Sequence, residues 1–328
     1  MSDSAATPSV SVVMPTFNRR AFLPRMLEPL LSEPDALEIV VVDDGSGDGS
    51  FELLAQLAQR DPRLRPVRIE NSGMGEARMA GARLARGEVV LLLDDDVLVA
   101  PGTVGGHGRA HAAAKGLVVV GAMPVSGGPQ VDAGDYPRVM YASEYRRHCE
   151  RWLRHPETVL STLWAGHLSL ARTDLLALEP PSPAELARGY HSDIDFGLRC
   201  QRAGLKGVYD PSLAAEHLYT RDADAFVRDA RNSGQSLALL HQTYARELGP
   251  FTDRELLSTI PAPVRVVVGL SRTRRWPARL ADLAVLGFGR LRLYRLQRGA
   301  AYVRKWMEQA RELAVVAEPV QAAGGARR

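Results

Sequence analysis

Cysteine is scarce in this sequence, with only Cys149 and Cys200 among 328 residues. Two cysteines cannot form the disulfide framework of a small secreted domain, and they lack the paired CxxC spacing of a zinc site. We therefore expect two reduced thiols, as in a cytoplasmic protein.

Long apolar runs are also missing. The longest, such as residues 39–42 and 89–93, have the length of strands, whereas a membrane-spanning helix needs about 18 to 20 apolar residues. Residues 1–9 are small and polar and lack the apolar segment of a secretory leader. The sequence therefore predicts a cytoplasmic chain without membrane spans, attached at most to the inner face of a membrane.

Acidic residues are nearly absent from residues 261–305, which hold eleven Lys or Arg residues and one acid, Asp282. The net charge of this stretch is +10, whereas the net charge of the whole chain is +3. Because the charges after residue 305 cancel, residues 1–260 carry a net charge of −7. Apolar residues interleave with the arginines, and residues 280–296 fit an amphipathic helix. Two interpretations stay open: the stretch lies on an anionic membrane surface, or it packs on the acidic body or forms a dimer contact. A nucleic-acid partner is disfavoured, because no nucleic-acid-binding motif accompanies the charge.

Strand and helix patterns alternate over about the first hundred residues. Short apolar strands are predicted at 10–14, 39–42, 67–69 and 88–93, and helices at 20–32, 51–59 and 75–86. This alternation predicts a mostly parallel sheet with helices on both faces, a Rossmann-like α/β/α sandwich. Ligands bind beyond the carboxyl ends of the strands in such sheets.

Three adjacent carboxylates, Asp94, Asp95 and Asp96, follow the most apolar strand. Adjacent carboxylates repel one another unless a cation or hydrogen bonds compensate. A hard divalent cation, Mn²⁺ or Mg²⁺, does this well, and Mg²⁺ usually keeps substrate phosphates among its ligands. Asp94 and Asp96 point to the same side of an extended chain, so they can share one metal ion. A solvated acidic turn or a helix cap is the alternative.

Two other acidic segments stand at the end of a strand or the start of a helix. Asp43 and Asp44 close the strand at 39–42, where one carboxylate can accept a hydrogen bond from a nucleobase or a ribose. An Asx-type turn is the alternative there. Asp193 begins a helix predicted at 192–203, where it can serve as a general base or as an N-cap.

The order and spacing of these segments resemble family 2 glycosyltransferases, which have the GT-A fold. The resemblance covers about residues 10–217. It rests on SVVMPTFNR at 11–19, EIVVVDDGS at 38–46, NSGMGEAR at 71–78, LDDD at 93–96 as the DxD motif, and SDIDFGLR at 192–199.

The resemblance implies a metal-assisted, inverting transfer of a sugar from a nucleoside diphosphate donor to a hydroxyl group. A UDP-sugar is the favoured donor, and the acceptor is a sugar, a lipid-linked molecule or a small molecule. Asp193 would be the catalytic base, and Asp94 and Asp96 would bind Mn²⁺ or Mg²⁺ with His217 as a further ligand. The residues that would contact the donor are Pro15, Thr16, Asn18, Asp43, Asp44, Arg78, Asp94 and Asp95.

We expect four regions along the chain: a disordered N-terminus at 1–9, a nucleotide-sugar-binding half at 10–100, an acceptor-binding half at 101–220, and a basic helical extension with a disordered tail at 221–328.

The sequence departs from the family pattern at three positions. Ser192 stands where an acid usually precedes the base, Met79 where an asparagine follows Ala-Arg, and His167 where an asparagine is common. A nucleotide-sugar-binding protein without turnover is therefore the main alternative. A sugar nucleotidyltransferase is disfavoured because residues 15–20 contain no glycine. The QxxRW signature of processive polymerases is also missing.

Overall fold

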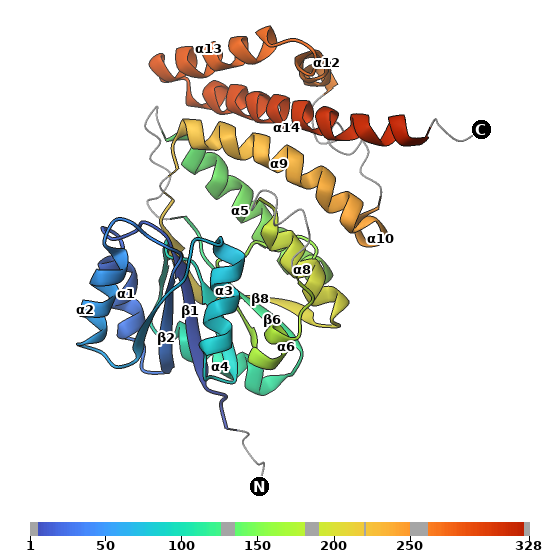
Figure 1. The fold of residues 1–328 in the computed structure, drawn as a ribbon. Helices are drawn as coiled ribbons and strands as arrows, with labels where there is room; N and C mark the ends of the chain where they lie inside the picture. Colours follow the sequence, from blue (N-terminus) through green and yellow to red (C-terminus); the bar gives the residue numbers. More distant parts are fainter. Residues whose placement is uncertain (1–5, 126–134, 181–189, 220, 250–261, 325–328) are drawn as a thin grey trace. The chain divides into compact units, whose positions relative to one another are not determined.

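The computed structural model describes residues 6–125, 135–180, 190–219, 221–249 and 262–324 (Figure 1). The predicted disordered ends lie partly outside these ranges, since residues 1–5 and 325–328 are not described. The carbonyl of Ser9 accepts a hydrogen bond from the amide of Val89 at 3.0 Å. At the other end, helix α14 continues to Gly324.

An eight-stranded sheet has the order β3-β2-β1-β4-β7-β6-β8-β5. Four strands from the first hundred residues are parallel and form one half of it: β1 (Val10–Thr16), β2 (Ala36–Asp43), β3 (Leu64–Arg68) and β4 (Val89–Leu93). The other half contains β7 (His167–Ala171), antiparallel to β4 and β6 (Leu117–Ala122), then β8 (Lys206–His217) parallel to β6, and β5 (Val97–Val99) antiparallel to β8. The predicted α/β architecture with a mostly parallel sheet is confirmed.

Each face of the sheet has its own apolar core, because successive residues of a strand point to opposite faces. On one face, Val12 and Leu91 pack in a cluster with helices α1 (Leu23–Leu31), α2 (Ser50–Ala58) and α4 (Thr103–Ala113). On the other, Val13 and Leu92 pack in a cluster with α3 (Met74–Leu84), α6 (Arg172–Leu176) and the apolar residues of α8 (Ser192–Arg202). Burial on both faces explains why these strands read as continuous apolar runs.

Helix α3 approaches β1 closely because of its small residues. A Cβ atom at Gly81 would overlap the side chain of Val13, and Ala77 and Ala82 are fully buried. The Ala- and Gly-rich composition of the predicted helix at 75–86 is therefore explained by packing distance. Because α3 lies so close to the sheet, Arg78 on the same helix lies beside the end of the sheet.

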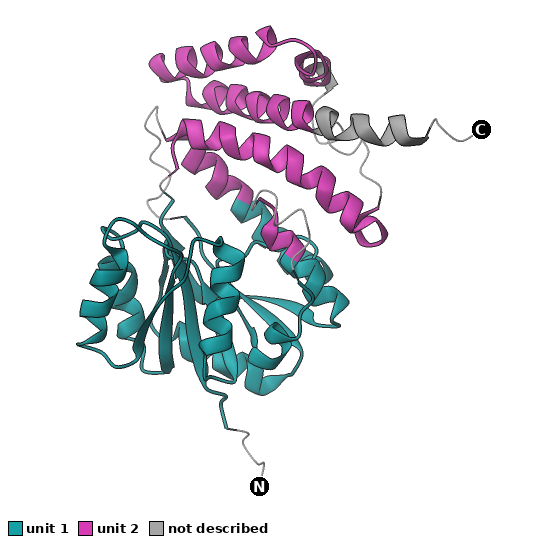
Figure 2. Cartoon of the chain, in the orientation of Figure 1, with its two compact units in different colours: residues 1–126, 145–181, 196–219 teal, residues 127–144, 182–195, 220–328 magenta. Residues whose placement is uncertain are grey.

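The chain divides into two compact units (Figure 2). The first contains residues 1–126, 145–181 and 196–219, and the second contains 127–144, 182–195 and 220–328. The sheet belongs to the first unit. Two helices, α5 (Tyr136–Arg154) and α8, have residues in both.

The second unit is helical, with α9 (Ala223–Thr243), α10 (Ala245–Leu248), α12 (Ala262–Ser271), α13 (Trp276–Arg290) and α14 (Tyr294–Gly324). Helix α14 packs against α9, α12 and α13. Val268, Ala281 and Met307 lie in one cluster between α12, α13 and α14. Among the described residues, none of the helices combines the length and the apolar character that crossing a membrane requires.

The single amphipathic helix predicted at 280–296 is wrong, because α13 ends at Arg290 and α14 begins at Tyr294. Arg292 between them has a φ of 55°, in the left-handed region. The amide of Leu293 donates to the carbonyl of Phe288 at 2.8 Å, which closes the end of α13. Two glycines in the last turn of α13, Gly287 and Gly289, lower the helix propensity just before the break.

Candidate active site

The acidic edge of the sheet, which we define as Thr16, Asp43, Asp94, Asp95 and Asp96, lies where β1, β2 and β4 end. Thr16 and Asp43 are register partners at the ends of β1 and β2, and Asp94 directly follows β4. Parallel strands bring their carboxyl ends to the same edge, so segments far apart in sequence meet there.

Asp95 is the least exposed member of the aspartate triplet, with 14% of its side-chain surface exposed. Its carboxylate accepts a hydrogen bond from the Thr16 hydroxyl at 2.7 Å and lies 3.6 Å from Nε of Arg19. Burial raises the pKa of Asp95 to about 6, with a smaller upward contribution from the charges of Asp96 and Asp94, against the opposing effects of Thr16 and Arg19. Asp95 is thus tied into the protein, while the side chains of Asp94 and Asp96 keep 24% and 27% of their surface exposed.

Asp94 is held by contacts on both its side chain and its backbone. Nη2 of Arg78 donates to its carboxylate at 2.6 Å, and its amide donates to the carbonyl of Gly166 at 2.9 Å. Gly166 has a φ of 126°, and a Cβ there would lie 3.0 Å from Asp94 Oδ2. A side chain at residue 166 would therefore crowd the carboxylate as well as strain the backbone.

Asp96 and His217 are far apart in sequence but meet where β5 pairs with β8. His217 Nε2 lies 3.4 Å from Asp96 Oδ1, because β5 pairs with β8 in a register that sets Val97 opposite His217. In the described part of the chain, no three His, Cys, Asp or Glu side chains are arranged to hold a metal ion. Asp96 and His217 supply two donors, which suits a cation whose other ligands come from a diphosphate and water.

The loops after β1 and β2 are tied together beside the acidic edge. Asn18 has a φ of 54°. Its side-chain oxygen accepts a hydrogen bond from the backbone amide of Gly47 at 2.9 Å, and its backbone amide donates to the Ser46 hydroxyl at 2.8 Å. Pro15 is buried within β1 opposite Val42. Both residues therefore shape this end of the sheet.

Asp43 and Asp44 have different surroundings. The buried Asp43 accepts from the amide of Ser46 at 3.3 Å and lies 3.4 Å from Nε of Arg68. The two carboxylate oxygens of Asp44 accept from the amides of Ser72 at 2.7 Å and Gly73 at 2.9 Å. Asp44 thus holds the loop that leads into α3, so its contacts in this structure are those of a loop anchor.

Asp193 lies in the first turn of α8 and in the second unit. His191, two residues before it, has a φ of 58°. Asp195, two residues after it, is fully buried and accepts a hydrogen bond from the Tyr244 hydroxyl at 2.8 Å. The role of Asp193 as a base stays a prediction.

Arg19 is a site residue that sequence reasoning did not single out. Its guanidinium lies 3.6 Å from Asp95 and 3.8 Å from Asp96. The available signal was its place three residues beyond Thr16, at the edge where the acidic residues also gather.

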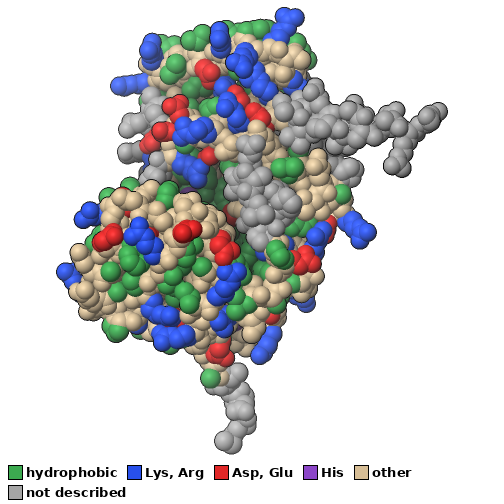
Figure 3. Space-filling model, in the orientation of Figure 1, with side chains coloured by type: hydrophobic (Ala, Val, Ile, Leu, Met, Phe, Trp, Pro, Cys, Tyr) green, Lys and Arg blue, Asp and Glu red, His purple; other side chains and the backbone are tan. Residues whose placement is uncertain are grey.

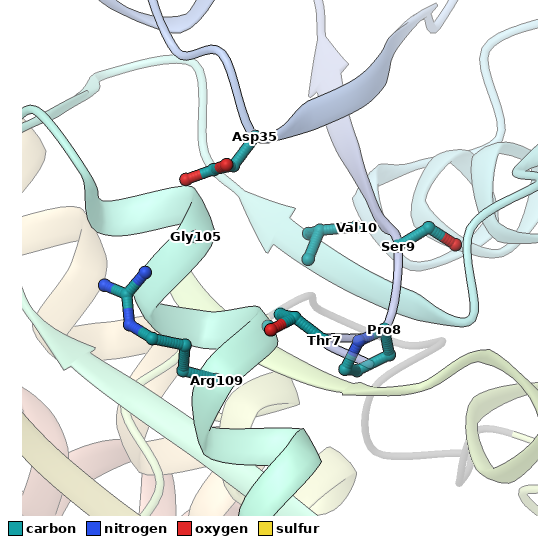
Figure 4. Close-up of a pocket in the computed structure, with 8 residues that line it drawn as sticks. Thr7, Pro8, Ser9, Val10, Asp35, Gly105 and Arg109 are labelled. Carbon is teal, nitrogen blue, oxygen red and sulfur yellow. The ribbon is translucent and has the colours of Figure 1, made fainter. Parts of the chain in front are cut away.

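A separate cavity of about 230 Å³ lies at the amino ends of β1 and β2 (Figure 4). It is lined by Thr7, Pro8, Ser9, Val10, Asp35, Gly105, Gly108 and Arg109. None of the predicted site residues lines it, so it is distinct from the acidic edge.

Comparisons with known proteins identify a family and a fold. Residues 11–166 match the family model described as glycosyl transferase family 2. The putative glycosyltransferase EpsH of Bacillus subtilis is 34% identical over 96 residues, 29% of this chain and 28% of that protein. The undecaprenyl-phosphate 4-deoxy-4-formamido-L-arabinose transferase of Edwardsiella ictaluri is 38% identical over 128 residues, 37% of this chain and 38% of that protein.

The chain thus matches well under half the length of these curated relatives. Among solved structures, the mannosyltransferase PcManGT from Pyrobaculum calidifontis, in complex with GDP-Man and Mn²⁺, aligns over 94% of this chain and 87% of that one. The TM-score is 0.55 at 18% sequence identity, a likeness that shows the fold. With the GT-A fold and a family match over residues 11–166, this part of the chain is a glycosyl transferase family 2 domain.

Proposed function

We propose that this protein transfers a sugar from a nucleoside diphosphate donor to an acceptor hydroxyl, with inversion at the anomeric carbon. The observation that carries the proposal is the acidic edge, where Asp94 meets Arg78 and Asp96 meets His217. Carboxylates alone would repel a diphosphate. The neighbouring arginines and a bound divalent cation would reverse that local charge.

The donor would lie across the ends of β1, β2 and β4. Mn²⁺ or Mg²⁺ would be held by Asp96 and His217, with Asp94 as a further ligand once the cation binds, and as a Lewis acid it would stabilise the charge on the leaving diphosphate. Arg78 and Arg19 would add fixed positive charge beside the phosphates, and Asp43 and Asp44 would contact the nucleoside. We propose a UDP-sugar as the donor, with a GDP-sugar as the alternative to be tested.

Asp193 would act as the general base. An acceptor hydroxyl is a weak nucleophile, and removing its proton during attack contributes typically 10²- to 10⁴-fold in rate. Asp193 is partly exposed in the first turn of α8, as a base that must meet an acceptor would be.

The acceptor would be lipid-linked, reached at an anionic membrane surface through residues 261–305. The relative from Edwardsiella ictaluri is named as an undecaprenyl-phosphate transferase. In α13, the large side chains Leu280, Leu283 and Leu286 are 54%, 64% and 60% exposed, whereas Ala281 and Gly289 face inward. Figure 3 shows hydrophobic and basic side chains side by side over these helices, at the top of the view. Apolar residues flanked by arginines are typical of a surface that rests on anionic lipid.

The test is a screen of UDP-, GDP- and dTDP-sugars with and without Mn²⁺, followed by kinetics on two variants. A ligand that binds only the folded chain raises its melting temperature. Asp193→Asn should keep donor affinity and lower the transfer rate roughly 100-fold or more. Asp224→Asn, which changes an acid in the first turn of α9, is the matched control and should transfer at the wild-type rate.

Transfer by Asp193→Asn at the wild-type rate would remove the base assignment. Donor binding without any turnover in the wild-type protein would instead favour a binding protein, the alternative that Ser192 and Met79 suggest.

A further inference from the structure

We infer that the helices after residue 220 position the proposed catalytic base, through anchors on both sides of Asp193. On one side, Nε2 of His191 and the Ser233 hydroxyl on α9 are hydrogen-bonded at 2.9 Å. On the other side, Tyr244 at the end of α9 donates to Asp195 at 2.8 Å. The inference rests on the proposed function, because it assigns a task to residues around the base.

The His191 anchor holds a strained backbone. A φ of 58° is unusual for a residue with a side chain and persists only where the surroundings enforce it. The Ser233 hydroxyl is such a restraint, and it also accepts from the Gln309 side chain on α14 at 3.1 Å. The carbonyl of His191 accepts from the amide of Asp195 at 3.1 Å, so the strained residue also begins the first turn of α8.

The Asp195 anchor is buried. Asp195 and Tyr244 are 0% and 1% exposed, so their hydrogen bond forms where water cannot replace it. The chain is therefore held two residues before and two residues after Asp193. Position matters for a base, since a misplacement of about 1 Å can lower a rate roughly 100-fold.

Helices α9 and α14 form a close crossing at this level. A Cβ at Gly234 would lie 2.7 Å from the backbone oxygen of Gln309, so the residue next to Ser233 already touches α14. Lys305 on α14 adds an ion pair with Glu144 at 2.7 Å. The basic C-terminal helices thus contribute to placing the base, beyond any contact with a membrane.

The test compares three hydroxyl deletions in the full chain. Tyr244→Phe and Ser233→Ala each remove one anchor, and Ser236→Ala is the matched control. Ser236 is on α9 and 0% exposed, and its hydroxyl makes no hydrogen bond to any residue that the structure describes. We expect Tyr244→Phe and Ser233→Ala to lower kcat about 10- to 100-fold with donor KM unchanged, and Ser236→Ala to leave both unchanged.

Melting temperature separates positioning from folding. A variant with a lower melting temperature but the wild-type kcat has lost stability without losing the position of the base. That result for both anchors would overturn the inference. Gln309→Ala gives a further measurement if Ser233→Ala does not fold, and it should lower kcat in the same direction. Loss of transfer in Asp193→Asn alone, without an effect of the anchors, would leave the proposed function standing and reject the inference.

Discussion

Asp95 differs from Asp94 and Asp96 although the three are adjacent in sequence. Thr16 donates to Asp95 from the neighbouring strand, and burial raises the pKa of Asp95 to about 6. Asp94 and Asp96 keep part of their surface exposed beside Arg78 and His217. We interpret Asp95 as the residue that fixes the turn, which leaves its two neighbours oriented toward a ligand.

Thr16→Val tests this interpretation, because it removes the hydroxyl and preserves the shape of the side chain. Loss of a donor to a buried acceptor typically lowers the free energy of unfolding by about 1 to 3 kcal/mol. Thr103→Val is the control, since its hydroxyl donates to the carbonyl of Ala214 at 2.8 Å, outside the acidic edge. Both variants should be destabilised in urea titrations, but calorimetry should show weaker metal-dependent donor binding only for Thr16→Val. Equal donor affinity in the two variants would mean that Asp95 does not orient the triplet.

At the scale of elements, α13 places its larger apolar residues outward and its smaller ones inward. Trp276, Leu280 and Leu283 are spaced by four and three residues and lie on one exposed face. Arg279 and Arg290 are also exposed on this helix. A helix that only capped the molecule would gain more by burying its leucines, so the arrangement favours a further apolar partner.

We expect the full chain to bind vesicles of phosphatidylcholine with phosphatidylglycerol and not vesicles of phosphatidylcholine alone. Changing Leu280, Leu283 and Leu286 together to serine should weaken binding at least tenfold in flotation assays, since each leucine loses apolar burial. Arg279→Gln should weaken it roughly fivefold, with the remaining affinity less sensitive to salt.

The control for the triple change replaces the exposed residues Leu37, Leu84 and Leu153 of the first unit with serine. Binding that survives the triple change in α13 would contradict the membrane assignment. A dimer in sedimentation that dissociates with the same change would identify the face as a protein contact instead.

At the scale of the whole molecule, buried histidines make stability depend on pH. In the first unit, the Ser169 hydroxyl is hydrogen-bonded to His107 at 2.7 Å and to His111 at 2.8 Å, and His107 is in turn hydrogen-bonded to His167 at 3.1 Å. With His167 donating to the carbonyl of Ala122, one arrangement of protons satisfies every group while all three rings stay neutral. Burial lowers the pKa of His167 to about 4, and burial also lowers the pKa of His107 and His111.

Stability should therefore fall as the pH drops from about 6.5 toward 4. The unfolded chain takes up protons near the ordinary histidine pKa of about 6.5, while the folded chain does not. In this window His167 lowers the free energy of unfolding by about 1.4 kcal/mol per pH unit, and His107 and His111 act in the same direction. Asp95 acts in the opposite direction below its pKa of about 6, because the folded state then binds the proton, and it offsets one histidine.

Melting temperatures between pH 7.5 and pH 4.5 measure this slope. His167→Asn keeps a polar side chain that does not titrate, so its melting temperature should fall less steeply with acidification. A melting temperature that is constant over this range in the wild-type protein would show that the histidines are not held neutral.

The sequence alone determined the order of strands and helices over the first hundred residues, the acidic edge and the family resemblance. These depend on local patterns: apolar runs of strand length, helical spacing, and acids placed where a strand ends. Such signals are carried by neighbours in the chain, so they can be read before the chain is folded.

Only the tertiary structure decided which aspartate of the triplet is least exposed, that Arg19 lies beside it, and that His217 reaches Asp96. It also divided the predicted helix at 280–296 and turned its leucines outward. Burial and ion pairing depend on residues that are distant in sequence. Sequence patterns do not show which of these distant side chains come into contact. For that reason the acidic side chains at the strand ends could be predicted from the sequence, while Arg19 and the partner of each acid came from the fold.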